Sequence, residues 1–413
     1  MHPMCPSNDK VILAMSGGVD SSVAAALLKE QGYGVTGVFL CLGQAGAAGQ
    51  GESRGCCSPR DAADARRVAD KLGIPLFVLD VADAFGPIVE DFMDEYARGR
   101  TPNPCIHCNA AVKFGRLMRH ADSIGVRYVA TGHYARVVGA TAGQTKVGGR
   151  ELGVGSEEQS RVRSSLPTPH SPHPTLSVSS DVPYIARARS LDKDQSYALW
   201  AVARENVGRM LLPIGEVQDK ARVRELARGL GLNVHDKPDS QEICFVADDD
   251  YVALLRARRP EALRPGRIVD SSGKVLGRHD GFAAFTIGQR HGLRVGGLKE
   301  PYYVLRIDPA SADVVVGPRA ETLTRHLRAG RANWHASLGA VPAGSEFDAI
   351  VQIRYNHRGA PGRVRITGQE SFEVEFTEPV SSVTPGQAAV VYEGERLLGG
   401  GWIEGLHLKR TVV

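Results

Sequence analysis

The sequence predicts an α/β protein in which a doubly wound parallel sheet is followed by a small central mixed domain and a C-terminal antiparallel β-barrel. Apolar strand-like runs alternate with amphipathic helical patterns from residue 11 to residue 138, and this alternation is typical of a parallel sheet. After residue 282 the chain consists of short β-rich runs separated by glycine, proline and aspartate, which favours antiparallel strands. The length of 413 residues fits two or three domains of the usual size.

The periodicity of apolar residues predicts the order of elements in the first part. Strands alternate with segments in which apolar residues recur every three or four positions, so each unit has the length of a βαβ crossover. The first helix begins near Asp20 and ends at Gly32, a residue type that commonly terminates helices. The predicted strands are 11–15, 35–40, 75–81 and 127–130, and the later predicted helices are 61–72, 88–98, 111–124, 195–209 and 218–229.

Changes in composition along the chain predict the domain boundaries. Residues 139–183 are rich in Gly, Ser, Thr, Pro and His without periodicity, so we expect a disordered insertion there. We expect the parallel-sheet domain at 1–210, the small central domain at 211–280 and the β-barrel at 281–413.

Composition and charge exclude several classes of protein. Hydrophobic residues make up 42% and charged residues 23%, which is globular and excludes wholesale disorder. No run of about 18 apolar residues occurs and the N-terminus lacks a signal-peptide pattern, so we expect a cytoplasmic protein without a membrane partner. Residues 254–413 hold 22 lysines and arginines against 16 aspartates and glutamates, which is consistent with a nucleic-acid partner.

Residues Ser16 to Ser22, SGGVDSS, lie between the first strand and the first helix and predict an anion-binding loop. The two glycines let backbone N–H groups converge, and the serine hydroxyls and the helix N-terminus add donors and partial positive charge. Such a loop suits a pyrophosphate. The Walker pattern G-x-x-x-x-G-K-[ST] is absent, so γ-phosphoryl transfer of the usual P-loop kind is not indicated. A glycine-containing turn capped by serine and aspartate is the alternative.

Three of the seven cysteines stand in segments that suit chemistry. The segment TPNPCIHCN, held extended by two prolines, presents Cys105 and Cys108, and DSQEICF presents Cys244. A buried, inert thiol is the alternative for any one of them. In a cytosolic chain, catalytic, metal-binding or buried thiols are expected rather than a disulfide framework. The cysteines for which we expect a packed, structural or metal-binding role are Cys5, Cys41, Cys56 and Cys57.

The loop SGGVDS resembles the PP-loop of the N-type ATP pyrophosphatases, which cleave ATP between the α and β phosphates. That motif alone also fits GMP synthetase, argininosuccinate synthetase, tRNA lysidine synthetase and the tRNA thiolases. PNP-x-x-x-CN followed by DS-x-x-ICF resembles the tRNA-specific 2-thiouridylases, which thiolate the wobble uridine. The resemblance covers nearly the whole chain except 139–183 and implies a PP-loop domain, a small central domain and a C-terminal barrel. The other segments that resemble this family are 130–137, 191–199, 288–293, 354–355 and 384–392.

The resemblance implies an ATP-dependent tRNA-uridine 2-sulfurtransferase. The oxygen on C2 of uracil is a poor leaving group, so it would first be adenylated, and sulfur would then displace AMP. Asp20 is implied as a catalytic residue, and ATP with Mg²⁺ is implied at the PP-loop. The residues implied for ATP are Ala14, Met15, Ser16, Gly17, Gly18, Val19, Asp20, Ser21, Leu40 and Gly132.

The resemblance also implies the sulfur path and the tRNA contacts. Cys244 would receive a persulfide from a sulfur-donor protein, and Cys108 would be the nucleophile that ends in a transient disulfide with Cys244. The uridine would leave its stack to reach the adenylate. Taken singly, His133 could cap a strand, and Lys193 with Asp194 could be a solvated turn. The residues implied for the target base and tRNA are Asn103, Pro104, Cys105, His133, Lys193, Asp194, Gln195, Arg354, Tyr355 and Gln387.

Cys105 departs from the family pattern, because many members carry aspartate at this position. The loop is therefore Cys-x-x-Cys, and with Cys244 it could supply three thiolates to a sulfide-carrying [4Fe–4S] cluster. Two hypotheses use the same residues: persulfide and disulfide cycling of Cys108 and Cys244, which needs no bound metal, or a cluster on Cys105, Cys108 and Cys244. A third is that Cys105 is an additional packed thiol.

Two other functions stay open at the level of sequence. One is a different PP-loop tRNA modifier, such as a cytidine thiolase. The other is a non-catalytic tRNA-binding protein with a structural zinc held by cysteines, and the intact SGGVDS loop argues against it.

Overall fold

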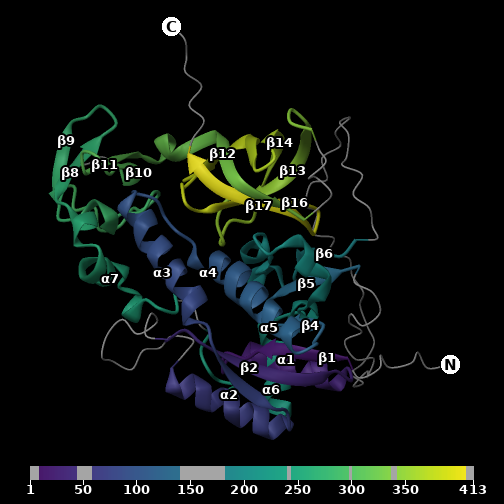
Figure 1. The fold of residues 1–413 in the computed structure, drawn as a ribbon. Helices are drawn as coiled ribbons and strands as arrows, with labels where there is room; N and C mark the ends of the chain where they lie inside the picture. Colours follow the sequence, from purple (N-terminus) through teal and green to yellow (C-terminus); the bar gives the residue numbers. More distant parts are fainter. Residues whose placement is uncertain are drawn as a thin grey trace, which may run out of the picture.

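The structure is a computed structural model that describes residues 9–43, 58–139, 182–239, 243–296, 300–335 and 342–405. A parallel sheet with its helices lies at the bottom of Figure 1, a barrel at the top and a smaller sheet at the upper left. This arrangement confirms the predicted fold class. The predictions for Cys5, Cys56 and Cys57, and for most of the insertion at 139–183, lie outside the described residues.

The first sheet has five parallel strands in the order β3-β2-β1-β4-β7. Val11, Ile12 and Leu13 of the central strand are completely buried, because helices cover both faces of a parallel sheet. The four predicted strands are present, and β7 is an additional edge strand. The strands are β1 (Lys10–Ala14), β2 (Gly34–Cys41), β3 (Leu76–Asp80), β4 (Tyr128–Ala130) and β7 (Met210–Leu211).

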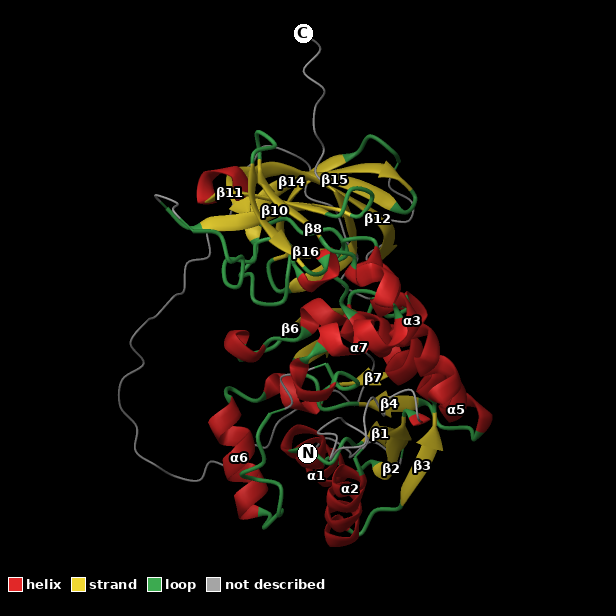
Figure 2. Cartoon of the chain, turned by 90° about the vertical axis from the view of Figure 1, so that its left-hand side faces the viewer, coloured by secondary structure: helices red, strands yellow, loops and turns green. Residues whose placement is uncertain are grey.

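Helices pack on both faces of this sheet (Figure 2). Val11 and Leu13 share a core with α1, α2 and α6, whereas Ile12 shares a core with α5 on the opposite face. This alternation follows from the two-residue period of a strand. Residues 220–229, expected in the central domain, thus pack on the first sheet as α6. The helices are α1 (Val19–Glu30), α2 (Pro59–Leu72), α3 (Ala82–Ala97), α4 (Pro104–His107), α5 (Leu117–Ser123), α6 (Lys220–Gly229) and α7 (Tyr251–Arg258).

The helix α3 begins earlier than its sequence predicts. It starts at Ala82 rather than near residue 88 and continues through Pro87. Phe85, in the added turn, is 1% exposed and contacts the ring of Phe245 with centroids 5.6 Å apart. The stabilisation from burying this aromatic side chain therefore outweighs the loss of the backbone hydrogen bond that Pro87 cannot donate.

The segment expected as a helix at 195–209 forms short 3₁₀ turns instead, at Ser196–Leu199 and Arg204–Arg209. The tightly wound turns place Tyr197 and Trp200 in the core that this segment shares with barrel strands. Tertiary packing has overridden the local helical pattern here.

The second sheet has four strands in the order β10-β11-β8-β9. Residues 302–318, which we expected among the barrel strands, supply β10 and β11 to this sheet. Val304, Val314 and Val316 are fully buried there, in the same core as α3, and this burial explains the pairing. The strands are β8 (Gly266–Asp270), β9 (Val275–His279), β10 (Tyr302–Asp308) and β11 (Asp313–Pro318).

The predicted C-terminal barrel is present and has six antiparallel strands. Their order is β12-β15-β14-β13-β16-β17, and β12 also pairs with β17, which closes the barrel. The hairpin of β5 and β6 extends this sheet through a pairing of β6 with β17. The strands are β5 (Ala135–Val138), β6 (Tyr184–Arg187), β12 (Leu323–Trp334), β13 (Glu346–Gln352), β14 (Ala360–Gly368), β15 (Ser371–Ser381), β16 (Ala388–Glu393) and β17 (Arg396–Gly405).

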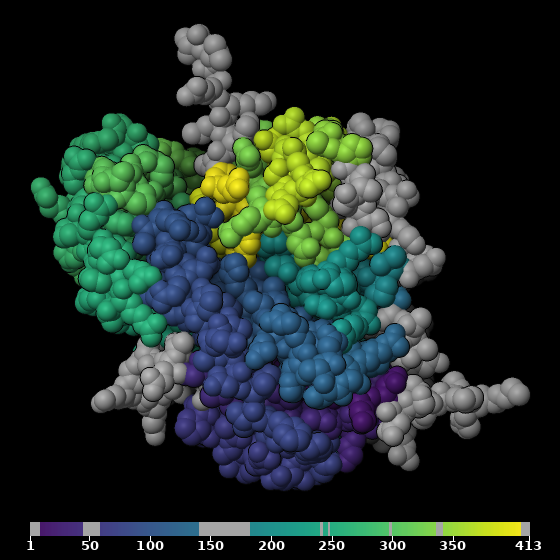
Figure 3. Space-filling view, viewed as in Figure 1, coloured from purple at the N-terminus to yellow at the C-terminus, as the bar shows by residue number. Residues whose placement is uncertain are grey.

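The barrel and the first sheet share a hydrophobic core. Figure 3 shows the barrel in contact with the blue and teal segments that lie between it and the purple N-terminal part. Trp200 is 1% exposed and packs edge-on against Trp402 of β17, with ring centroids 5.5 Å apart. The hydroxyl of Tyr197 donates to the carbonyl oxygen of Ala388 at 3.0 Å. The two parts therefore hold a fixed relative position.

Removing the shared aromatic side chain should loosen this contact. We expect Trp200→Ala to lower the free energy of unfolding by about 3–5 kcal/mol, because it empties a large volume from a packed core. The matched control is Phe77→Ala, since Phe77 is 60% exposed on β3. Denaturant unfolding followed by circular dichroism measures both, and equal shifts for the two variants would contradict this account.

Candidate active site

The loop predicted to bind the nucleotide, Ser16 to Ser22, is called the nucleotide loop below. It lies where β1 ends and α1 begins, at the carboxyl edge of the first sheet. Gly17 has a φ of +71°, and a Cβ on it would lie 2.2 Å from the carbonyl oxygen of Asp61, so only glycine fits. The hydroxyls of Ser22 and Ser21 donate to the carbonyl oxygen of Gly18 at 2.7 and 3.2 Å. The loop is thereby fixed in front of the first turn of α1, whose backbone N–H groups suit an anion.

The neighbouring strands bring the other predicted nucleotide residues to the same edge. Gly132 follows β4, and a Cβ on it would lie 2.7 Å from the backbone nitrogen of Ser21. Leu40 lies near the end of β2, and Ala14 and Met15 lie at the end of β1. Ligands of open α/β sheets bind outside the carboxyl ends of the strands, so this is the expected position for a nucleotide.

Two residues far away in the sequence hold the side chain of Asp20. The hydroxyl of Tyr134 donates to Oδ1 at 2.8 Å, and Nζ of Lys220 donates to both carboxylate oxygens at 2.8 Å. Burial, and then the negative charge of Asp20, raise the pKa of Tyr134 far above its ordinary value. The hydroxyl therefore keeps its proton and remains a donor to Asp20.

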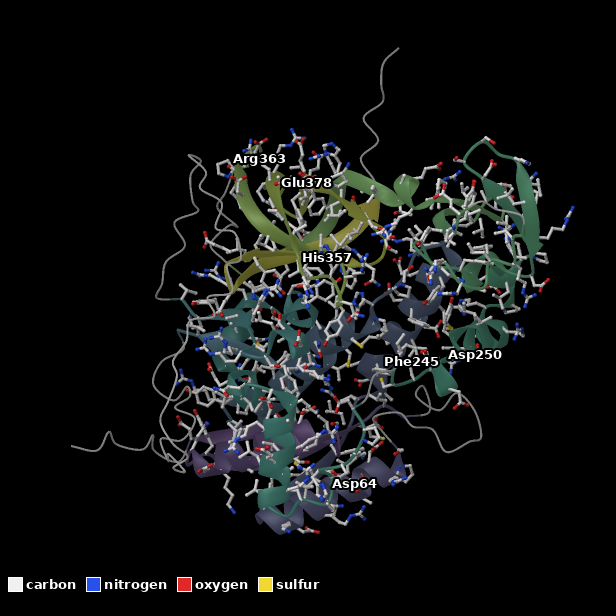
Figure 4. The ribbon with its side chains drawn as sticks, turned by 180° about the vertical axis from the view of Figure 1, so that it is seen from behind. Asp64, Phe245, Asp250, His357, Arg363 and Glu378 are labelled. Atoms are coloured by element: carbon white, nitrogen blue, oxygen red, sulfur yellow. The ribbon has the colours of Figure 1, made fainter. Side chains whose placement is uncertain are left out.

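A lysine from the segment that precedes Cys244 fixes the outer side of the loop. Nζ of Lys237 donates to the carbonyl oxygen of Gly17 at 2.9 Å and to Asp61 and Asp64 of α2 at 2.5 and 2.7 Å. Figure 4 labels Asp64. Burial would lower the pKa of Lys237, but its hydrogen bonds to the two aspartates outweigh burial and raise it. A charged lysine thus joins the loop to α2.

Asp239 begins the DS-x-x-ICF motif and lies among three cations. It accepts from Lys220 at 2.8 Å and from Lys193 and Arg224 at 3.1 Å each. Burial would raise the pKa of Asp239, but the hydrogen bonds from Lys220 and Lys193 outweigh burial and lower it. Lys220 therefore lies between two carboxylates, those of Asp20 and Asp239.

The barrel positions the TPNPC loop. Nε2 of Gln387 donates to the carbonyl oxygens of Thr101 and Pro102 at 3.1 and 3.2 Å. The backbone nitrogen of Thr101 donates to the carbonyl oxygen of Pro385 at 2.9 Å. Gly386 has a φ of +89°, and a Cβ on it would lie 2.7 Å from the carbonyl oxygen of Thr101. Gln387 therefore contacts the loop that carries Cys105.

Cys105 and Cys108 lie on one helix that changes its winding at Cys108. The helix begins at Pro104, earlier than the predicted residue 111, and continues from α4 through a π-helical segment, Cys108–Arg116, into α5. π-Helical segments are rare and occur frequently at functional sites. Cys105 is exposed, whereas Cys108 is half-buried.

Cys108, Cys244 and Leu40 pack against the same hydrophobic cluster. Phe245, labelled in Figure 4, belongs to this cluster and contacts Phe92 of α3 with ring centroids 5.1 Å apart. Cys244 is half-buried, like Cys108. Two thiols from distant parts of the sequence therefore pack against the cluster that Leu40 of β2 also contacts.

The three thiols do not form a metal-binding group. Among the residues that the structure describes, no three or more His, Cys, Asp or Glu side chains are arranged to hold a metal ion. Cys105 is exposed, whereas Cys108 and Cys244 are half-buried. This donor set does not fit the [4Fe–4S] alternative.

Polar contacts join the barrel to the nucleotide loop. Tyr355, which is 44% exposed, hydrogen-bonds to the side chain of Gln195. Oε1 of Gln195 accepts from the backbone nitrogen of Tyr134 at 2.9 Å, and Tyr134 holds Asp20. Burial first, then the negative charge of Asp194 and last the proximity of Cys105 raise the pKa of Tyr355. Residues predicted for tRNA and for ATP are thus connected through side chains.

Other residues predicted for tRNA occupy different environments. Arg354 is exposed and Asn103 is half-buried, whereas Pro104 is buried. Nδ1 of His133 lies 2.7 Å from the hydroxyl of Thr131, and burial, followed by the charge of Lys113, lowers the pKa of His133 well below its ordinary value. His133 is therefore neutral at pH 7.

Asp194 is buried rather than presented to solvent. Its side chain is 4% exposed, and its carboxylate accepts from Arg187 at 2.8 Å, from the hydroxyl of Ser196 at 2.9 Å and from the backbone nitrogen of Ala188 at 3.0 Å. Asp194 thus fixes the chain that carries Lys193 and Gln195.

Sequence reasoning missed four residues that contact the nucleotide loop or its partners. In the sequence they appear only as a tyrosine inside ATGHYARV, a lysine at the start of a predicted helix, and a lysine and an aspartate in DKPDS. Each looks like a solvated residue until a distant partner is known. The four residues are Tyr134, Lys220, Lys237 and Asp239.

The family-model comparison identifies the parallel sheet, with the loop after its first strand, as a HUP domain. The family model described as "tRNA methyl transferase HUP domain" matches residues 9–248. The "tRNA methyl transferase PRC-barrel domain" matches 253–318, and the "Aminomethyltransferase beta-barrel domain" matches 324–403.

Full-length relatives define the family more narrowly. The chain is 42% identical to "tRNA-specific 2-thiouridylase MnmA" of Rhodopirellula baltica, over 95% of this chain and 96% of that one. It is 43% identical to the protein of the same name from Carboxydothermus hydrogenoformans, over 96% and 97%, and 40% identical to that of Rhodospirillum centenum, over 96% and 92%. The chain belongs to the tRNA-specific 2-thiouridylase (MnmA) family.

Among the described residues, no helix is both long enough and apolar enough to cross a bilayer.

The turn that positions the TPNPC loop offers a first test. We expect Gly386→Ala to reduce stability by about 1–3 kcal/mol, because a positive φ and a close carbonyl both oppose a side chain. Gly394→Ala is the control, since its φ is +56° with nothing within 4 Å of the added Cβ. Thermal unfolding that shifts no further for Gly386→Ala than for Gly394→Ala would refute the close contact.

The pKa of Asp64 gives a pH-dependent prediction. Burial would raise this pKa, but hydrogen bonds from Lys237 and Arg67 outweigh burial and lower it below the ordinary value. The carboxylate therefore stabilises the fold above its unfolded pKa of about 4, and this contribution is lost as pH falls through the lower folded pKa.

Accordingly, Asp64→Asn should unfold at a lower temperature than the wild type at pH 7, and the difference should shrink below about pH 4. Asp70→Asn, at an exposed position of the same helix, should show a small effect at both pH values. A difference for Asp64→Asn that does not vary between pH 7 and pH 3 would show that its carboxylate has no stabilising charge.

Proposed function

We propose that this protein is an ATP-dependent enzyme that thiolates C2 of the wobble uridine of tRNA. The observation that carries the proposal is that Leu40, a residue predicted for ATP, packs against the same hydrophobic cluster as Cys108 and Cys244. The names of the relatives, all tRNA-specific 2-thiouridylases, support the same reaction. Methyl transfer, mentioned in the family-model description, needs no pair of thiols.

The nucleotide loop fits the pyrophosphate part of ATP. The positive φ of Gly17 lets the loop turn in front of α1, and the N-terminus of α1 attracts the charge of the phosphates. Asp20 offers carboxylate oxygens of the kind that Mg²⁺ prefers, and bound Mg²⁺ would neutralise phosphate charge. Leu40 and Gly132 border the place for the adenine or ribose.

The first half-reaction activates the base. The O2 atom of the uracil attacks the α-phosphorus of ATP, the bond from that phosphorus to the bridging oxygen breaks, and pyrophosphate leaves. Bound close together, the base and ATP react without the entropy loss of a bimolecular encounter. The product is an O-adenylated uridine whose C2 now carries a good leaving group, AMP.

The second half-reaction transfers sulfur. The terminal sulfur of a persulfide on Cys244 attacks C2, and AMP leaves with the former O2 atom. The Cys108 thiolate then attacks the Cys244 sulfur, which breaks the bond to the transferred atom and forms the Cys108–Cys244 disulfide. The electron pair released reduces the transferred sulfur to the thiocarbonyl level, so an external thiol must reduce the disulfide before the next turnover.

The persulfide route is proposed in preference to the cluster, because the described residues contain no group of three or more His, Cys, Asp or Glu side chains that could hold a metal ion. A protein that carries a persulfide or sulfide is therefore the proposed donor. Cys105 instead lies near Tyr355, on the side proposed for the target base.

The proposed tRNA contacts combine the TPNPC loop with the barrel. Arg354 and Tyr355 are exposed and offer a cation and an aromatic face, which suit phosphate and an unstacked base. Asn103, Gln195 and Gln387 add polar groups. We assign His133, Lys193, Pro104 and Asp194 to positioning, since they are neutral, paired or buried. Acting on tRNA, the enzyme would work in the cytoplasm.

The nucleotide half-reaction is tested at Asp20. We expect Asp20→Ala to reduce tRNA-dependent AMP release at least about a hundredfold, because the Mg²⁺ that neutralises the phosphate charge loses its carboxylate ligand. AMP and thiouridine are measured by chromatography and mass spectrometry of digested tRNA. Normal AMP release by this variant would remove Asp20 from the site, and a wild type that forms cytidine products would favour a different PP-loop modifier.

The sulfur half-reaction is tested at the thiols. We expect Cys108→Ser and Cys244→Ser to stop multiple-turnover thiolation while still releasing pyrophosphate in a single turnover, because adenylation of the base needs neither thiol, whereas serine cannot carry or displace a persulfide. Cys105→Ser should keep thiolation with weaker tRNA binding. Equal loss in all three variants, together with about four irons in anaerobically purified protein, would replace the persulfide route with the cluster.

A further inference from the structure

Lys220 occupies an unusual place for a residue at the start of a surface helix. Its side chain is only 13% exposed, and Nζ lies 2.8 Å from both oxygens of Asp20 and 2.8 Å from Oδ1 of Asp239. It also lies 5.6 Å from the ring centroid of Tyr134, whose hydroxyl shares Asp20. A compact ammonium group is therefore held directly at the nucleotide loop.

The partners of Lys220 differ in what a nucleotide would do to them. Asp20 lies in the loop and is the carboxylate proposed for Mg²⁺. Asp239 lies outside the loop and keeps two further cations, Lys193 and Arg224, at 3.1 Å. If Mg²⁺ takes oxygens of Asp20, Lys220 loses its partner in the loop, whereas Asp239 remains neutralised without it.

We infer that Lys220 is a nucleotide-binding residue whose ammonium exchanges Asp20 for a phosphate oxygen of ATP when Mg²⁺–ATP enters the loop. Asp239 holds the ammonium at the loop until then. This inference rests on the proposed ATP-dependent function and adds a residue to that site. A lysine suits the exchange, because its three donors on a flexible stem can change acceptors without moving the backbone.

The alternative is that Lys220 only stabilises the fold through its ion pair with Asp239. The two explanations predict different results when each partner is removed in turn. Lys220→Ala and Asp239→Asn remove the same ion pair, so both should then weaken ATP binding. Loss of a phosphate ligand occurs only in the lysine variant.

The experiment measures Mg²⁺–ATP binding by calorimetry and KM for ATP in tRNA-dependent AMP release, using the full chain. We expect Lys220→Ala to raise Kd and KM about tenfold or more, since a charge-assisted hydrogen bond is lost. Asp239→Asn should leave Kd unchanged or lower it, because the Asp239 carboxylate then no longer competes with the phosphate for the Lys220 ammonium. Lys220→Arg should recover part of the binding.

Arg222→Ala is the matched control, because Arg222 lies on the same helix and its exposed side chain pairs with Glu225. It should bind ATP like the wild type. Circular dichroism and thermal unfolding identify any variant that fails to fold. If Lys220→Ala does not fold, the Kd values of Asp239→Asn and Lys220→Arg are compared instead.

The outcomes separate this inference from the proposed function. A wild type that binds no Mg²⁺–ATP would overturn the proposed function itself. A wild type that binds it, with Lys220→Ala binding equally well, would overturn only the role of Lys220. Equal weakening by Lys220→Ala and Asp239→Asn would also overturn it, in favour of a structural ion pair.

Discussion

The close approach of backbone at two glycines is the constraint on which the site depends. At Gly17 the loop passes so near α2 that a Cβ would overlap the carbonyl of Asp61, and at Gly132 the chain after β4 lies close to the start of α1. These contacts bring the ends of β1 and β4 together with the first turns of α1 and α2. Lys237 then ties Gly17 to α2 with a charged hydrogen bond, and Lys220 and Tyr134 orient Asp20.

The rest of the molecule supplies chemistry to that space. The barrel fixes the TPNPC loop through Gln387 and Gly386. Cys108 and Cys244 pack against the hydrophobic cluster that Leu40 of β2 also contacts. A shared core around Trp200 keeps the barrel and the first sheet in one position. The nucleotide, the base and the sulfur carriers would therefore meet at a place that no single domain forms alone.

Sequence reasoning predicted the parts of this arrangement that depend on local pattern. The strand of β1 and the loop before α1 were predictable, because a run buried on both faces followed by two glycines has few other structures. The barrel strands and the thiol segments were also recognisable. The placement of residues 302–318 was not, because apolar alternation predicts a strand but not the sheet that it joins.

The charged contacts of the site were the least predictable. Lys220 and Asp20 are 200 residues apart in sequence, and nothing local distinguishes that lysine from a solvated one. Asp194 was predicted to contact tRNA, but its side chain is buried and pairs with Arg187. The π-helical segment at Cys108 likewise depends on packing rather than on propensity.

The central claim is that O2 of the wobble uridine leaves as part of AMP, and isotope transfer tests it most directly. A tRNA whose wobble uridine carries ¹⁸O at O2 is thiolated with unlabelled ATP, and the AMP and pyrophosphate are analysed by mass spectrometry. The account predicts one ¹⁸O in AMP for each thiouridine formed, with unlabelled pyrophosphate. Thiouridine formed alongside unlabelled AMP would contradict adenylation of the base.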